Sequence, residues 1–241
     1  GTEAQLDKLG GASWQGRKAR LKQRLREIAS ELIKVAALRQ VKQAPVLAPP
    51  AGAYDEFVAR FPYEETDDQA GAIDAVVGDL GAGRPMDRLI CGDVGFGKTE
   101  VALRAALIAV LGGFQVAVVV PTTLLARQHF KTFTDRFQGL PIVVRQASRM
   151  VSGKELADVK AGLKSGQIDI VVGTHALLGK QIEFQRLGLL VIDEEQHFGV
   201  AHKERLKQLR DDVHVLTLSA TPIPRTLQLA LSGVRELSLI A

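Results

Sequence analysis

The residues most clearly suited to chemistry form a glycine-rich stretch that ends in a lysine and a threonine. It fits the pattern G-x-x-x-x-G-K-[ST] and reads Gly92-Asp93-Val94-Gly95-Phe96-Gly97-Lys98-Thr99. In such a loop the glycines let backbone N–H groups turn toward phosphates, the lysine reaches the β- and γ-phosphates, and the threonine hydroxyl ligates Mg²⁺. The stretch therefore predicts a site for ATP and Mg²⁺ at Lys98 and Thr99, against the simpler alternative of a glycine-rich turn.

A second group of polar residues follows an apolar run. Asp193-Glu194-Glu195-Gln196 comes directly after residues 189–192, which read Leu-Leu-Val-Ile. Asp193 is predicted to hold Mg²⁺ through water, and Glu194 to orient and deprotonate the attacking water, because phosphoryl transfer depends on positioning and charge neutralisation. The alternative is an acidic helix start, which the helix dipole favours.

Small hydroxyl residues close another apolar run further along the chain. Ser219-Ala220-Thr221 follows residues 213–218 and precedes Pro222. Taken alone, this segment also suits a turn followed by a helix that begins with proline.

The elements that must position these residues alternate between short apolar strands and helical stretches. Runs of Val, Ile and Leu are typical of strands that are buried on both faces, so the sequence predicts an α/β fold with a mainly parallel sheet covered by helices on both faces. The ligand site is expected at the carboxyl ends of the strands. The predicted strands are residues 88–91, 115–120, 142–145, 168–172, 189–192 and 213–218.

The first fifty residues differ from the rest in charge and pattern. Residues 1–50 hold ten Lys and Arg against four Asp and Glu, a net +6, whereas residues 51–241 carry −2. Apolar residues at spacings of three and four predict one long amphipathic helix over residues 14–43, and the prolines beyond it predict a linker. We expect residues 1–12 to be the tail of a preceding domain, residues 13–52 a connector helix with its linker, and residues 53–241 a single P-loop lobe. The basic helix suits nucleic acid, an acidic partner or a solvated face.

Composition excludes several classes of protein. The only cysteine, Cys91, cannot form a disulfide framework or a cysteine-based zinc site. No apolar run approaches the roughly 20 residues of a membrane helix, and the first residues lack the layout of a signal peptide. We therefore expect no membrane partner and a cytoplasmic protein.

In their order along the chain, these motifs resemble the first RecA-like lobe of superfamily 2 helicases and translocases. The set runs from the phosphate loop through Pro121-Thr122-Thr123-Leu124-Leu125 and Gly173-Thr174-His175 to Asp193-Glu194-Glu195-Gln196 and Ser219-Ala220-Thr221. Within that superfamily the chain is most similar to the bacterial transcription-repair coupling factors, with RecG-like helicases as their nearest relatives. The motif His197-Phe198-Gly199-Val200 belongs to this similarity, much of which RecG-like sequences share. Three features favour the coupling factors: Phe96, where RecG-like sequences usually have serine, Ser232-Gly233-Val234-Arg235-Glu236-Leu237, and Leu9-Gly10-Gly11 with Trp14 before the long helix.

The resemblance implies roles for further residues. Phe61 and Gln69 would recognise adenine, and Glu100 would extend the phosphate-loop set. The residues implied to face the nucleic-acid backbone are Thr122, Arg127, Arg149, Gly173, Thr174 and His175. From the residues alone, Gln69 would be a polar surface residue and His175 a surface or core histidine.

The resemblance also implies that the acidic box communicates with Ser219, Ala220 and Thr221. Gln196 stands where related sequences commonly have histidine. A neutral amide donates and accepts hydrogen bonds but does not become charged, so we expect the link to depend less on pH.

For the intact protein, the resemblance implies an ATP-dependent translocase on double-stranded DNA that displaces stalled RNA polymerase and recruits excision-repair proteins such as UvrA. The polymerase would bind a domain upstream of Gly1, and a second lobe would supply arginines for ATP cleavage, so the 241-residue chain is expected to be nearly inactive alone. The alternatives are a RecG-like remodeller of branched DNA and a nucleotide-dependent binding or switch module.

Overall fold

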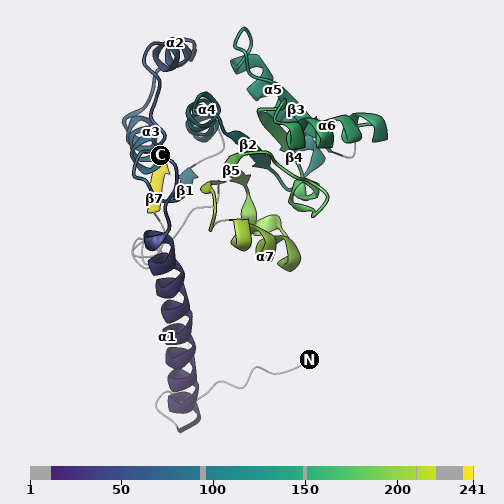
Figure 1. The fold of residues 1–241 in the computed structure, drawn as a ribbon. Coiled ribbons are helices and arrows are strands. Elements are labelled where there is room, and N and C mark those ends of the chain that lie inside the picture. The colour runs from purple at the N-terminus through teal and green to yellow at the C-terminus, as the bar shows by residue number, and fades with distance from the viewer. Residues whose placement is uncertain (1–11, 93–95, 149–150, 210, 221–235, 241) are drawn as a thin grey trace.

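The lobe is built on one seven-stranded sheet in which every strand pair is parallel (Figure 1). The computed structural model describes residues 12–92, 96–148, 151–209, 211–220 and 236–240. The strand order is β3-β4-β2-β5-β6-β1-β7. The strands are β1 (Asp87–Gly92), β2 (Gln115–Val119), β3 (Val144–Ala147), β4 (Ile170–Gly173), β5 (Leu187–Asp193), β6 (His214–Ser219) and β7 (Glu236–Ile240). The predicted parallel α/β fold is confirmed.

Two apolar cores lie on opposite faces of this sheet because successive strand side chains point to opposite sides. Within β2, Val116 and Val118 belong to one core, whereas Ala117 and Val119 belong to the other. The helices that cover the first face are α2 (Ala53–Ala59), α3 (Asp67–Leu80), α4 (Phe96–Leu111) and α5 (Thr123–Arg136). The second face is covered by α6 (Gly153–Ser165), η1 (His175–Leu178) and α7 (Val200–Leu209). Burial on both faces explains why the central strands are continuously apolar.

All six predicted strands lie within two residues of their observed bounds, and two differences from the prediction have physical causes. The strand predicted at residues 142–145 is found at Val144–Ala147, since it is an edge strand whose apolar run begins in the loop before it. The strand β7 was not predicted. It pairs with β1 at the other edge and is only partly buried, so its sequence lacks a continuous apolar run.

Parallel pairing brings the carboxyl ends of the central strands into one row. Cys91 of β1 is paired with Ser219 of β6, and Leu218 of β6 is paired with Asp193 of β5. Gly92, which begins the phosphate loop, therefore lies on the same edge of the sheet as the acidic box. This is the edge at which the sequence places the ligand site.

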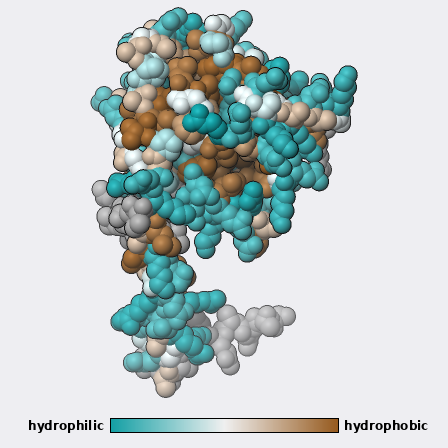
Figure 2. Space-filling model, in the orientation of Figure 1, coloured by the Kyte–Doolittle hydropathy of each residue, from teal (hydrophilic) through white to brown (hydrophobic). Residues whose placement is uncertain are grey.

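The helix α1 (Ala12–Val41) extends away from the sheet as a rod (Figure 1). In its predicted apolar stripe, Leu21, Leu25 and Ile28 are all more than half exposed. Figure 2 shows mostly hydrophilic side chains on this face of the rod. Hydrogen bonds one turn apart, such as that from Gln23 to Glu27, support the helix locally.

The predicted linker that follows α1 packs on the lobe. The backbone N–H of Ala44 donates to Gly83 and that of Leu47 donates to Leu80, at 2.8 and 2.9 Å. Leu47 is only 4% exposed, and its side chain reaches the end of α4, where a Cβ on Gly112, the residue after the helix, would lie 2.7 Å from it. The segment therefore belongs to the first core.

Replacing Leu47 with alanine should destabilise the lobe. Truncation of a buried leucine leaves a cavity, so we expect the free energy of unfolding to fall by about 2 to 5 kcal/mol. Val46→Ala is the matched control, because Val46 is 69% exposed and surface changes usually stay within about 0.5 kcal/mol. Denaturant unfolding of the two variants measures the difference, and equal small effects would show that the segment does not contribute to the core.

Candidate nucleotide and nucleic-acid site

The lysine and threonine of the predicted phosphate loop lie at the start of α4, directly after β1. The Lys98 ammonium donates a hydrogen bond of 2.8 Å to the Gly92 carbonyl, and its side chain is buried. A buried ammonium needs an acceptor, and phosphate oxygens, which are themselves charged, would accept stronger hydrogen bonds than this neutral carbonyl does. Of the loop itself, Asp93, Val94 and Gly95 lie outside the described residues, and only the backbone of Phe96 is described.

The residues predicted to recognise adenine, Phe61 and Gln69, each lie near α4, but the pocket lined by Phe61 does not include Gln69. Gln69 is buried, and its amide oxygen accepts from the Thr66 N–H in a capping box that begins α3. Its amide nitrogen faces Gly97, where an added Cβ would lie 3.2 Å away. The interpretation of Gln69 as a polar surface residue is therefore wrong, and the capping box explains part of its burial.

Phe61 lines a pocket of about 210 Å³ next to the phosphate loop. The pocket is lined by Phe61, Pro62, Tyr63, Thr99, Glu100, Leu103, Thr132, Asp135 and Arg136. One wall is therefore aromatic and another belongs to the helix that carries Lys98 and Thr99. An apolar pocket with a few polar groups beside a phosphate site suits a nucleobase.

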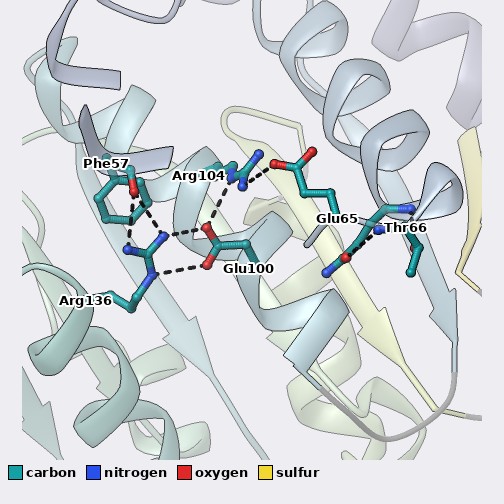
Figure 3. A network of polar contacts seen from close by, with 7 residues as sticks. Phe57, Glu65, Thr66, Glu100, Arg104 and Arg136 are labelled. Carbon is teal, nitrogen blue, oxygen red and sulfur yellow. Dashed lines mark hydrogen bonds and ion pairs between the residues drawn. The ribbon is translucent and has the colours of Figure 1, made fainter. Parts of the chain in front are cut away.

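Glu100 is the centre of a buried ionic network (Figure 3). Its carboxylate accepts hydrogen bonds from Arg104, one turn further along α4, and from Arg136 at the end of α5. Arg136 also donates to the Phe57 carbonyl, and Arg104 lies 2.6 Å from the Glu65 carboxylate. Burial by itself would lower the pKa of Arg104, but the hydrogen bonds to Glu65 and Glu100 raise it above its ordinary value. Glu100 thus lines the pocket while its charge is compensated by arginines.

Asp193 ends β5 and is held by a residue that the sequence did not single out. The imidazole Nε2 of His129, on α5, lies 2.7 Å from the Asp193 carboxylate. His129 shows no ligand spacing along the chain, because its partner lies 64 residues away. The contact depends on how α5 packs against the carboxyl end of β5, which only the fold reveals.

Glu194 connects the acidic box to the Ser219-Ala220-Thr221 segment. Its carboxylate accepts a hydrogen bond of 2.9 Å from the Ala220 N–H, and its own N–H donates to the Leu218 carbonyl at 3.0 Å. Glu194 also has a φ of 54°, the only positive φ of a non-glycine residue in the described ranges. Such a conformation is costly for a residue with a Cβ and is held here by both hydrogen bonds. The link was expected at Gln196, whose side chain is not described, and Thr221 lies outside the described residues.

The predicted nucleic-acid contacts follow the neighbouring strands β2 and β4. Thr122 and Arg127 lie at the first turns of α5, and the Thr122 hydroxyl caps this helix by accepting from the Leu125 N–H. Gly173 and Thr174 are buried where β4 ends, and a Cβ on Gly173 would collide with the Ala147 carbonyl. His175 stacks on His202 of α7, with 4.4 Å between ring centroids. Arg149 lies outside the described residues.

The donor set at the carboxyl ends of β1 and β5 fits a magnesium ion bound together with a nucleotide. Thr99 offers a hydroxyl and Asp193 a carboxylate, the hard oxygen ligands that Mg²⁺ prefers, and Mg²⁺ usually takes its remaining ligands from water and substrate phosphates. Within the ranges that the structure describes, no group of three or more His, Cys, Asp or Glu side chains could hold a metal ion by itself. Among the same residues, no helix is long and apolar enough to cross a membrane.

The chain is similar to known helicases and to transcription-repair-coupling factors. The family model of the DEAD/DEAH box helicases matches residues 66–230. The transcription-repair-coupling factor of Staphylococcus epidermidis is 52% identical over 235 residues, which is 98% of this chain and 20% of that protein. That of Rickettsia bellii is 53% identical over 242 residues, 99% of this chain and 22% of that protein. The chain thus spans about a fifth of the length of these curated relatives.

Solved structures show the same fold. The structure of RecG bound to a three-way DNA junction superposes with a TM-score of 0.74 at 33% sequence identity, covering 88% of this chain and 30% of that chain. The helicase MrfA bound to DNA has a TM-score of 0.57 at 18% identity, which supports the fold alone.

Replacing Lys98 with alanine should weaken nucleotide binding. Loss of the charged hydrogen bonds to phosphate removes about 1.5 to 3 kcal/mol, so we expect the Kd for ATP with Mg²⁺ to rise about 10-fold to 150-fold. Lys131→Ala is the matched control, because Lys131 is 78% exposed and pairs with Asp135 on the same helix. Titration with a fluorescent ATP analogue measures both, and equal affinities for the two variants would contradict the assignment of Lys98.

Proposed function

Because the chain belongs to the DEAD/DEAH box helicase family and is similar to transcription-repair-coupling factors along nearly its whole length, we propose that it is the first motor lobe of a DNA translocase. In this proposal the intact protein hydrolyses ATP, moves along double-stranded DNA, displaces stalled RNA polymerase and couples transcription to nucleotide excision repair. RNA polymerase and excision-repair proteins such as UvrA are its proposed protein partners.

One observation carries the choice among superfamily 2 enzymes. The family model begins at residue 66, whereas the 52% identity to the coupling factors covers 98% of the chain and therefore includes α1 and the segment that docks Leu47. The identity to RecG is 33% over 88% of the chain. A generic helicase lobe has no need of the N-terminal rod, so similarity across it favours the coupling factors.

The proposed chemistry divides between residues that bind ATP and residues that prepare water. Lys98 would hold the β- and γ-phosphates, and Phe61, Gln69 and the pocket beside them would hold the adenine. Mg²⁺, when bound by Thr99 and Asp193 together with the phosphates, neutralises charge on the transferring group. Glu194 would orient the attacking water and accept its proton. Its hydrogen bond to Ala220 would connect this change in protonation to the residue after β6.

The proposed DNA surface suits recognition of a backbone. Hydroxyl groups, backbone N–H groups and an arginine bind phosphates without reading bases, and Thr122, Arg127, Thr174 and His175 offer these groups at the ends of β2 and β4. A translocase must bind any sequence that it meets, so contacts of this kind fit the proposed activity.

We expect Glu194→Gln in a protein of the relatives' full length to bind ATP and lose its hydrolysis. Removal of a general base lowers kcat by about 10² to 10⁴, while the amide still fills the same volume. The matched control is Glu204→Gln, because Glu204 is exposed on α7. DNA-stimulated ATPase rates and nucleotide affinity measure the two effects, and normal hydrolysis by the Glu194→Gln protein would favour a nucleotide-dependent switch instead.

The translocase proposal itself is tested on a stalled transcription complex. The wild-type protein should release RNA polymerase from DNA in an ATP-dependent manner, and the Glu194→Gln protein should not. Unwinding of forked DNA without release of polymerase would instead identify a RecG-like remodeller of branched DNA.

The 241-residue chain alone should bind ATP weakly and hydrolyse it hardly at all. In other NTPases, an arginine that contacts the transferring phosphoryl group raises the rate of hydrolysis about 10³-fold to 10⁵-fold. We propose that superfamily 2 motors use such an arginine and that a second lobe supplies it. Turnover of the isolated chain with and without DNA measures this, and robust DNA-stimulated hydrolysis would contradict it.

A further inference from the structure

The contact between His129 and Asp193 joins α5 to the carboxylate that is proposed to hold Mg²⁺. The Nε2–Oδ2 distance is 2.7 Å, and the two side chains are 11% and 14% exposed. An ionised carboxylate only accepts hydrogen bonds, so the imidazole donates through Nε2–H. A hydrogen bond this short and this shielded from water holds the Asp193 carboxylate in one orientation.

We propose that His129 is a positioning residue that orients Asp193 for Mg²⁺ bound with ATP, an inference that rests on the proposed function. The imidazole takes one lone pair of Oδ2, so Oδ1 is the oxygen with more acceptor capacity left for the metal or its water. Carboxylates that serve metals are generally held by a second hydrogen-bonding partner, and loss of that partner commonly weakens metal binding 10-fold to 100-fold. His129 is such a partner for Asp193.

The imidazole is itself fixed in place by the packing of α5. Its ring meets the fully buried Phe133 ring edge-on, with 6.5 Å between centroids and an angle of 74°. Further along the helix, Arg136 binds the Glu100 carboxylate in the network of Figure 3. The position of the imidazole is therefore determined by α5, which also lines the pocket beside Phe61.

The same helix begins among the proposed DNA contacts. Thr122 caps α5, and Arg127 lies two residues before His129. The proposed positioning residue and two of the proposed DNA contacts therefore lie on, or at the start of, one helix.

The pair of His129 and Asp193 could have one of three roles, and each role predicts a different result: it orients the carboxylate, it only stabilises the fold, or it blocks the metal. If the pair only stabilises the fold, its loss should lower the melting temperature and leave the Mg²⁺ requirement unchanged. If the imidazole occupies the place of the metal, its removal should make Mg²⁺ bind more tightly. Positioning predicts weaker binding of Mg²⁺.

The test compares three variants of the 241-residue chain, with a fluorescent ATP analogue as the probe. His129→Leu removes the donor, His129→Gln replaces it with an amide N–H of similar reach, and Gln128→Leu is the control at an exposed position of the same helix. The Mg²⁺ concentration for half-maximal binding of the analogue is measured for each, together with binding in EDTA and the melting temperature. We expect this Mg²⁺ concentration to rise about 10-fold or more in His129→Leu, to stay within about 3-fold of wild type in His129→Gln, and not to change in Gln128→Leu. Binding in EDTA should be the same for all.

An unchanged Mg²⁺ requirement in His129→Leu, a lower one, or equal losses in His129→Gln and His129→Leu would each overturn the proposal. If the wild-type chain binds the analogue without any dependence on Mg²⁺, the assignment of Asp193 as a metal residue fails, and the inference fails with it. If wild type depends on Mg²⁺ and the variants do not follow the expected order, only the role of His129 fails.

Discussion

The site depends above all on the parallel pairing of β5, β6 and β1. Parallel strands all end at the same edge of a sheet, and the observed register places Asp193 beside Leu218, and Ser219 beside Cys91. Gly92 and Asp193, which are far apart along the chain, are thereby aligned by the sheet itself. A shift of β6 by one residue would move each of its side chains from one core to the other. The packing of the two cores therefore also fixes the geometry of the site.

The same burial restricts where charge can lie. The strands are apolar almost throughout, and the polar residues of the site sit where strands end and loops or helices begin. The network around Glu100 is nevertheless buried, and its carboxylate is only 2% exposed. A buried carboxylate is tolerated only when it is paired and hydrogen-bonded, and here Arg104 and Arg136 come from different helices. The network therefore fixes α4, which carries Lys98, relative to α5, which carries His129.

The sequence predicted those features that are local. The phosphate loop, the acidic box and the central strands each have a signal within a few consecutive residues, and the structure aligns the strands that carry them as expected. The contact between His129 and Asp193 joins residues 64 positions apart and has no such signal. Glu100 looked like an extension of the phosphate loop, since its arginine partner on α5 is not visible from spacing. The edge strand β7 is partly exposed and lacks a buried strand's apolar run. In each case the deciding interaction is tertiary.

The backbone of Glu194 connects the proposed nucleotide site to the residues that follow β6. A positive φ at a residue with a Cβ costs on the order of 1 to 3 kcal/mol, and the hydrogen bonds to Leu218 and Ala220 hold it. Both partners lie at the end of β6. In the proposed function the Glu194 carboxylate would contact both the attacking water and the Ala220 N–H, so a change at the water would reach the residue that follows β6. Glu194 therefore links the acidic box to the end of β6 through both its backbone and its side chain.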